Sequence, residues 1–146
     1  MNNEALLIRE SIRDTIARYN HAGDRGKYAD MVACFHADGE LQIVDGETHR
    51  GHASLSTFFA NVGTNTTAPE TLTLLRHCVT NTLIEVISPT AAVADSYFQV
   101  LTNFGLDHWG RYRDHFAPER PSGRWLITTR SVKTDAYAAN SLFTTP

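Results

Sequence analysis

Four residues from three separate parts of the chain carry side chains able to donate, accept or stabilise a proton. Tyr19 and Asp24 fall at the end of the first helical pattern, whereas His77 and Arg130 fall in stretches that alternate like β-strands. A carboxylate bonded to one imidazole nitrogen sets the tautomer and makes the other nitrogen a better general base. An Arg or a Tyr hydroxyl beside them can stabilise an oxyanion or protonate a leaving group. These residue types predict proton abstraction by a general base, provided that the fold brings them together.

Each of the four residues also has a structural interpretation. Asp24 precedes the second helical pattern and could be its N-cap. His77 could be a hydrogen-bonded core histidine, and Arg130 could belong to a structural ion pair. Tyr19 lies on an apolar helix stripe and could simply be core. Local sequence leaves these alternatives open.

The first 63 residues predict three helices. The first runs from Glu4 to about His21, because apolar residues recur at three- and four-residue steps before Gly23. A short second helix and a third over residues 52–63 follow. The supporting apolar positions are Ala5, Ile8, Ile12, Ile16 and Tyr19, then Tyr28, Met31, Val32 and Phe35, then Leu55, Phe58, Phe59 and Val62.

The connections between these helices carry turn residues. "HADGE" at 36–40 predicts a turn, and "LQIVDGETHRG" at 41–51 predicts a short strand, a turn and a return strand. "TNTTAPE" at 64–70 predicts a polar loop.

The second half of the chain predicts long antiparallel strands. Residues 71–87, 90–104, 106–117 and 124–134 are rich in Thr, Val, Ile and aromatic residues. "FGLD" and "APERPSGR" between them suit hairpin connections. A run of helices followed by such strands predicts an α+β domain with the helices on one face of a curved sheet. We expect one domain over residues 1–146.

Period-two alternation predicts which strand residues face the core. His77 is expected on an inward face with Leu75, Val79, Asn81 and Leu83. Tyr112 and Asp114 are expected to point inward from the third long strand. Arg130 shares a side with Leu126, Thr128 and Val132, while Trp125 and Ile127 fall on the opposite side.

Composition excludes several classes of protein. The 146 residues carry a net charge of −3 and no run of Lys and Arg, which argues against nucleic-acid binding. No apolar stretch is long enough to span a membrane, and the N-terminus does not resemble a signal peptide. Cys34 and Cys78 lack metal-type spacing, so we expect a reduced, cytoplasmic protein without a metal site.

The order of elements and motifs resembles the SnoaL-like branch of the NTF2-like superfamily over nearly the whole chain. The motifs are "HADGEL", "GHASLSTFF", "RHCVTN", "GRYRDHF" and "GRWLITTRSVKTD". The resemblance implies a cone-shaped α+β fold in which three N-terminal helices pack on a strongly curved, mainly antiparallel sheet that encloses an apolar pocket. The lyase members include scytalone dehydratase, hexachlorocyclohexane dehydrochlorinase and bile-acid 7α-dehydratase.

The resemblance also assigns roles to residues. These lyases use an Asp–His dyad without metal or organic cofactor, and the dyad falls on Asp24 and His77. Arg130, five residues after Trp125, matches an Arg shared with these lyases, and Tyr19 matches a Tyr five residues before the Asp of the bile-acid enzyme. The substrate implied is a small hydrophobic molecule. Candidate pocket residues are Phe35, Phe58, Phe59, Phe98, Tyr112, Asp114 and Phe116.

Three kinds of function are compatible with this resemblance. A lyase, dehydratase or isomerase without a cofactor fits the Asp–His pairing best. The alternatives are a ligand-binding or accessory protein without catalysis, and a polyketide cyclase or an epoxide hydrolase, which would need Asp114 as a second carboxylate. The chain departs from the family in its longer "APERPSGR" loop. The second histidine of scytalone dehydratase also has no assigned match in this sequence, for which His108 and His115 are candidates.

A homodimer or homotrimer is expected. The resemblance implies it, and Trp109 lies on the predicted outer strand face with Arg111, Arg113 and His115. Aromatic and Arg side chains are enriched at protein interfaces.

Overall fold

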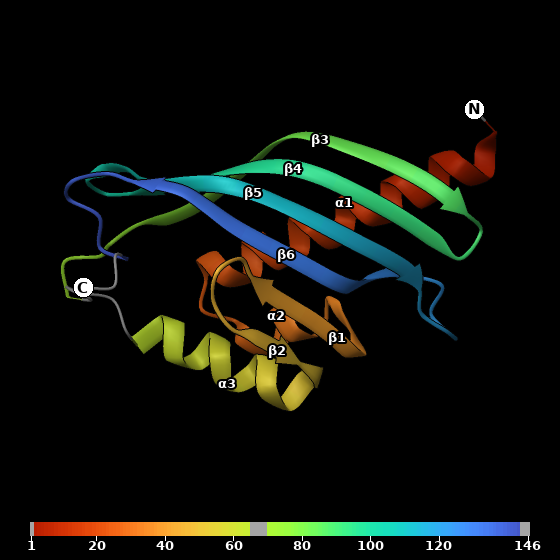
Figure 1. The fold of residues 1–146 in the computed structure, drawn as a ribbon, viewed down its shortest axis with the longest axis horizontal. Coiled ribbons are helices and arrows are strands. Elements are labelled where there is room, and N and C mark those ends of the chain that lie inside the picture. The colour runs from red at the N-terminus through yellow and green to blue at the C-terminus, as the bar shows by residue number, and fades with distance from the viewer. Residues whose placement is uncertain (1, 65–69, 144–146) are drawn as a thin grey trace.

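The protein is described by a computed structural model that covers residues 2–64 and 70–143. Most of the polar loop predicted at 64–70 lies outside the described residues. Within the described ranges, three helices pack on one six-stranded sheet that does not close into a barrel (Figure 1). The predicted α+β class and the helix-on-curved-sheet architecture are confirmed.

The three predicted helices are present. Helix α1 (Asn3–Asp24) is capped by Asn2, whose side chain accepts a hydrogen bond of 2.8 Å from the N–H of Ala5. Its buried stripe includes Ile8, Ile12, Ile16 and Tyr19. Helices α2 (Tyr28–Val32) and α3 (Gly51–Thr64) follow.

The turn predicted at 36–40 is wrong. Strand β1 (Phe35–Ile43) runs through this segment, and Phe35, predicted on the second helix, begins the strand. The pairing with the neighbouring strand breaks between Phe35 and Glu40, which lie opposite Ile127 and Thr129. Strand β1 therefore has more residues than its partner over this stretch. The extra residues interrupt the pairing, so residue types that are common in turns lie within a strand. Strand β2 (Thr48–Arg50) is the predicted return.

The long strands form the centre of the sheet. They are β3 (Leu75–Ser88), β4 (Ala91–Thr102), β5 (Gly105–Pro118) and β6 (Trp125–Tyr137), and the order across the sheet is β2-β1-β6-β5-β4-β3. Only the β1–β6 pair is parallel among these strands. In Figure 1, α1 runs behind the long strands and α3 lies beside β1 and β2, in agreement with the contacts of these elements.

Two breaks in strand pairing change which residues face inward. In β3, Asn81 has a φ of 54°, and the register with β4 shifts between Thr80 and Leu83. Asn81 and Leu83, predicted inward, are therefore exposed, and Ile84 is buried instead. His77 precedes this bulge, so its predicted direction toward the helices is unaffected.

A similar break occurs in β6. The register with β5 shifts between His115, opposite Thr129, and Phe116, opposite Ile127. Ile127 and Arg130 are consequently both fully buried, although alternation predicted opposite faces for them. Thr128 lies at the break, where its hydroxyl donates to the carbonyl of His115 at 3.1 Å.

The buried side chains form two clusters. The larger one lies between the helices and the sheet and includes Ile12, Leu55, Phe116 and Ile127. The smaller one consists of Phe98, Val100 and Tyr112 on β4 and β5. Among the described residues, no helix combines the length and apolar character needed to cross a membrane.

Candidate active site

Asp24 and His77 are in direct contact. The carboxylate of Asp24, the last residue of α1, accepts a hydrogen bond from Nδ1 of His77 at 2.6 Å. The same carboxylate accepts the backbone N–H of His77 at 3.0 and 3.2 Å. Because an ionised carboxylate only accepts hydrogen bonds, the proton of the neutral ring must sit on Nδ1. The Nε2 atom is therefore the free acceptor.

The N-cap interpretation of Asp24 is wrong. The N-cap of α2 is Lys27, and its side chain makes no capping hydrogen bond. The carboxylate of Asp24 is instead directed to β3, and its side chain is 11% exposed. The His77 side chain is 24% exposed, so the ring is held on one side and accessible on the other.

Arg130 and Asp114 form a buried ion pair. The Nε and Nη2 atoms of Arg130 donate to the two carboxylate oxygens of Asp114 at 2.8 and 2.7 Å, and both side chains are fully buried. The guanidinium carbon lies 4.3 Å from the ring centre of Tyr19 and 4.0 Å from that of Tyr112. Burial alone would lower the pKa of Arg130, but the Asp114 carboxylate outweighs it and raises this pKa above its ordinary value. In the described part of the chain, Nη1 of Arg130 has no hydrogen-bond partner.

The rings of Tyr19 and Tyr112 therefore both contact the permanently charged guanidinium of Arg130. Burial raises the pKa of Tyr19 and of Tyr112, although the charge of Arg130 opposes the shift. Both phenols remain protonated near neutral pH and can donate a proton or a hydrogen bond. Tyr112 packs in one cluster with Phe98 and with Val79, which lies two residues along β3 from His77.

The predicted pocket aromatics fall into the two buried clusters. Phe35, Phe58 and Phe59 pack with Tyr19 in the larger cluster, with Tyr19 edge-on to Phe35 and Phe59 at 6.0 Å. Phe116 is also there.

The smaller cluster connects the Asp24–His77 pair with the buried Arg130–Asp114 pair. Phe98 stacks on Tyr112 at 4.6 Å and is paired with Val79, two residues along β3 from His77. Tyr112 in turn covers Arg130, so the aromatic pair links the surroundings of His77 to the buried cation.

A second Asp–His pair was missed by the sequence reasoning. Asp107 accepts a hydrogen bond of 2.7 Å from Nδ1 of His108, one of 2.6 Å from the hydroxyl of Ser141 and one of 2.7 Å from the N–H of Leu142. Burial would raise the pKa of Asp107, but these hydrogen bonds outweigh it and lower the pKa. The adjacent "DH" letters were the available signal. Period-two alternation puts adjacent residues on opposite faces of a strand, and the register shift between Val100 and Leu101 brings these two side chains together.

His108 lies on the same face of the sheet as His77. His77 is paired with Val100, which is paired with His108, and His108 lies edge-on to Phe98 with ring centres 6.1 Å apart. Burial lowers the pKa of His108, and the charge of Asp107 opposes this shift. His115, the other candidate second histidine, is exposed on the opposite face.

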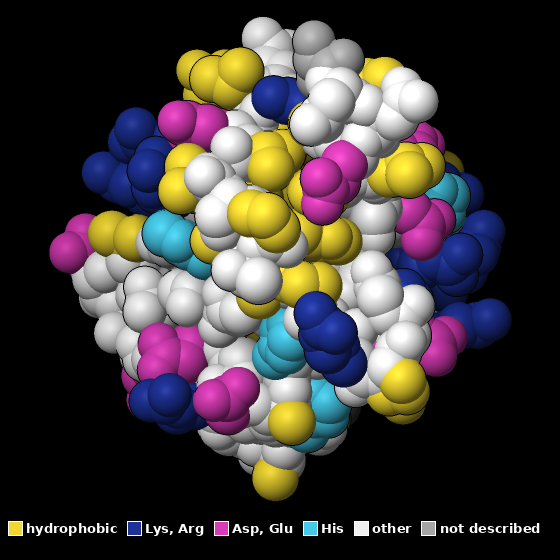
Figure 2. All heavy atoms as spheres, turned by 90° about the vertical axis from the view of Figure 1, so that its right-hand side faces the viewer, with side chains coloured by type: hydrophobic (Ala, Val, Ile, Leu, Met, Phe, Trp, Pro, Cys, Tyr) yellow, Lys and Arg dark blue, Asp and Glu magenta, His cyan; other side chains and the backbone are white. Residues whose placement is uncertain are grey.

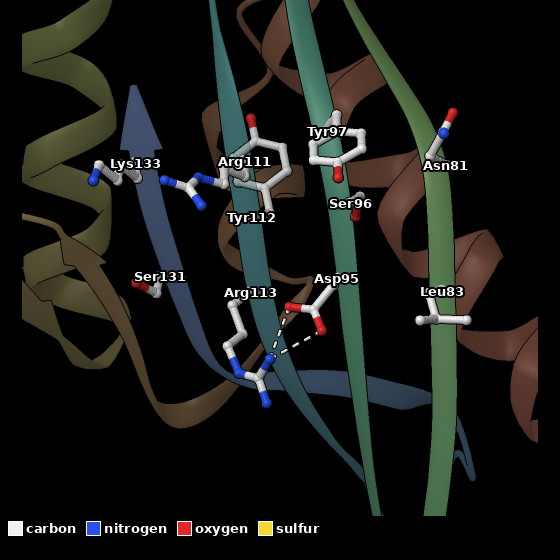
Figure 3. A pocket seen from close by; sticks show the side chains of 10 residues that line it. All are labelled: Asn81, Leu83, Asp95, Ser96, Tyr97, Arg111, Tyr112, Arg113, Ser131 and Lys133. Atoms are coloured by element: carbon white, nitrogen blue, oxygen red, sulfur yellow. Dashed lines mark hydrogen bonds and ion pairs between the residues drawn. The ribbon is translucent and has the colours of Figure 1, made fainter. Parts of the chain in front are cut away.

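A cavity of about 650 Å³ lies on the outer face of the sheet, away from the helices. It is lined by Leu83, Tyr97 and the exposed ion pair between Arg113 and Asp95, among others (Figure 3). Of the predicted pocket residues only Tyr112 lines it, and none of the four proton-transfer candidates does, so the cavity does not bring the predicted site together. Within the described ranges, no three His, Cys, Asp or Glu side chains are grouped closely enough to hold a metal ion.

The fold has many known relatives. A proposed scytalone dehydratase from Novosphingobium aromaticivorans superposes with a TM-score of 0.78 at 18% identity, with 100% of both chains covered. LinA, an HCH dehydrochlorinase, superposes with a TM-score of 0.75 at 19% identity, covering 98% of this chain and 97% of LinA. A protein of unknown function from Mycobacterium tuberculosis has a TM-score of 0.78 at 22% identity, covering 94% of this chain and 78% of that protein.

Sequence comparison identifies the family. No curated protein matches this sequence. Residues 4–131 match the SnoaL-like domain, which is most of the chain, and the chain therefore belongs to the SnoaL-like domain family.

Proposed function

We propose that the protein is a lyase of the dehydratase or dehydrohalogenase type, or an isomerase, that acts on a small hydrophobic molecule, including cyclic ones, without a cofactor. The observation that carries this proposal is the 2.6 Å hydrogen bond from Nδ1 of His77 to Asp24. It orients the ring and leaves Nε2 as a base whose protonated form the carboxylate stabilises. The proposed scytalone dehydratase and LinA, at 18% and 19% identity, share the fold of this chain, and a lyase is compatible with that fold.

In the proposed reaction, Nε2 of His77 removes a proton from a carbon next to an activating group. The electron pair of the broken C–H bond forms a double bond, and a hydroxide or halide leaves from the neighbouring carbon; in an isomerase, the proton returns at another carbon. Asp24 stabilises the imidazolium that forms. Tyr19 donates a hydrogen bond to the leaving group or carbonyl, and Arg130 stabilises developing negative charge. Asp114 already occupies two nitrogens of Arg130, so Nη1 is the group available for this role.

The epoxide-hydrolase alternative requires Arg130 between two carboxylates. Asp114 supplies one of these carboxylates. Asp24, which would have to be the other, is bonded to His77 instead. The Asp–His contact therefore favours the lyase or isomerase.

The proposal is tested with a panel of hydroxylated and halogenated cyclic compounds, incubated without metal or nucleotide. Wild-type protein is expected to convert at least one of them, and His77→Gln is expected to lower the rate by about 10²- to 10⁴-fold, because Gln keeps the polarity but cannot accept the proton. His115→Gln is the matched control, since His115 lies exposed on the other face of the sheet. Equal turnover by wild type and His77→Gln would contradict the proposal, because catalysis would not depend on His77. Conversion of none of the compounds by wild type would favour a ligand-binding protein without catalysis.

A further inference from the structure

A basic groove lies outside the candidate active site. It has a volume of about 310 Å³ and is formed by the last turns of α1, the residues of and around α2 and the segment before β6. Its cationic side chains are Arg18, Arg25, Lys27 and Arg124. None of the residues assigned to proton transfer lines it.

The charges in this groove are not balanced. Arg18 is paired with Asp14 at 2.6 Å, and Asp30 is the other nearby carboxylate. In the described part of the chain, Arg25, Lys27 and Arg124 form no ion pair. Four cations and two carboxylates leave two positive charges in excess, in a protein whose net charge is −3.

Helix capping does not account for these cations. Basic side chains at a helix C-terminus often bond the last carbonyl groups. Here the carbonyl of Ala22 accepts the N–H of Lys27 at 2.9 Å, and the carbonyl of Gly23 accepts the N–H of Gly26 at 3.2 Å. The backbone thus caps α1 without help from the side chains of Arg25 and Lys27.

The groove also has a fixed wall. Arg124 is half-buried, its carbonyl accepts the N–H of Glu119 at 2.7 Å, and its N–H donates to the hydroxyl of Ser122 at 3.2 Å. Cys34, 1% exposed, lies against the groove, and its thiol contacts the carbonyl of Asp30 at 3.4 Å. The cations therefore line a groove that the buried Cys34 side chain borders, and an anion in this groove would offset their mutual repulsion.

We propose that this groove binds a phosphate group, either free or as a phosphomonoester. A phosphomonoester carries about −1.5 to −2 charges at neutral pH, which matches the two excess positive charges, whereas a carboxylate carries one. Three of the four cations are Arg, whose planar guanidinium donates two parallel hydrogen bonds to phosphate oxygens. This proposal is independent of the proposed proton transfer.

The test is a titration of the full-length protein with inorganic phosphate, followed by heteronuclear NMR at low and constant ionic strength. Saturable shifts are expected for the backbone amides of Arg25, Lys27 and Arg124. Phenyl phosphate in a second titration distinguishes the sources: tighter binding than inorganic phosphate indicates a phosphorylated organic ligand, and equal binding indicates free phosphate.

Variants decide whether the groove is responsible. Arg25→Gln and Arg124→Gln are each expected to weaken phosphate binding by about tenfold or more, since each removes a charge-assisted hydrogen bond. Lys133→Gln, which removes an exposed charge from the outer sheet face, and His77→Gln are expected to bind like wild type. Shifts that do not saturate, or equal affinity in wild type and both Arg variants, would overturn the proposal.

Discussion

The contacts of His77 give the two nitrogens of its ring different roles. Asp24 contacts both Nδ1 and the backbone N–H of His77, so one carboxylate fixes the ring and the start of β3 together. Such a contact serves orientation as well as charge. The catalytic role assigned to the pair is a proposal that substitution can test.

At this residue scale, Asp24→Asn is expected to lower turnover by a factor comparable to that of His77→Gln. The Asn side chain lacks the charge that stabilises the imidazolium, and its amide can also hold the wrong tautomer. The double variant is expected to be little slower than either single variant, because residues that act as one unit are strongly non-additive. Steady-state kinetics on the converted substrate measures this. Multiplying effects in the double variant would show that the residues act separately.

The buried pair of Arg130 and Asp114 predicts a large effect on stability. Asp114→Asn leaves a fully buried guanidinium without its counter-charge, and we expect a loss of about 3–5 kcal/mol in the free energy of unfolding. Asp95→Asn is the matched control, because its pair with Arg113 is exposed, as Figure 3 shows, and such pairs contribute about 0–1 kcal/mol. Urea denaturation compares the two. Equal stability losses would contradict the prediction.

At the scale of the elements, close packing between β5 and β6 depends on Gly110. A Cβ atom at this position would lie 2.0 Å from the carbonyl oxygen of Lys133 and 2.9 Å from the ring of Phe98. The absence of a side chain allows Phe98 to lie over the strand and stack on Tyr112.

Gly110→Ala is therefore expected to destabilise the protein by about 1–3 kcal/mol or more, because the clash involves backbone that cannot move aside. Gly23→Ala is the control: its Cβ would meet only the flexible end of Met31 at 3.3 Å, and Ala is favoured in a helix. Thermal and urea denaturation measure both. A Gly110→Ala variant as stable as wild type would show that the strands separate without cost.

At the scale of the whole molecule, the outer face of the sheet is a candidate interface. It exposes Leu83 and Tyr97, which are 71% and 53% exposed, beside Arg111 and Arg113, and Trp109 lies half-buried in the same strand. A second hydrophobic area is visible at the end of the molecule where α1 begins, with both acidic and basic side chains around it (Figure 2). Exposed apolar groups beside Arg are typical of protein interfaces.

We expect a homodimer or homotrimer that uses the outer sheet face. Light scattering at tens of micromolar is expected to give two or three times the chain mass of 16.2 kDa. Tyr97→Asp is expected to shift the protein toward the monomer, whereas Leu7→Asp, on the exposed side of α1, is the control and is expected to leave the mass unchanged. A wild-type mass near that of one chain would contradict the prediction.

The sequence by itself determined the three helices, the four long strands and several of the directions in which side chains point. The helical spacing of Ile8, Ile12 and Ile16 predicted α1, and the strand pattern around His77 predicted its inward face. The contact between Asp24 and His77 was expected from the family resemblance and is present in the structure. Apolar periodicity carries this information because burial of one face of a helix or strand is a local property of the chain.

Only the tertiary structure decided where the strand pairing breaks and which polar groups meet. The bulge at Asn81, the break beside Thr128 and the strand through 36–40 depend on the partner strands, and period-two alternation cannot register an extra residue. The contacts of Asp107 with Ser141 and of Asp114 with Arg130 join segments far apart in sequence. A buried charge needs a partner, and no local sequence pattern identifies a partner from another segment. The packing of the whole sheet therefore decides which of these side chains meet.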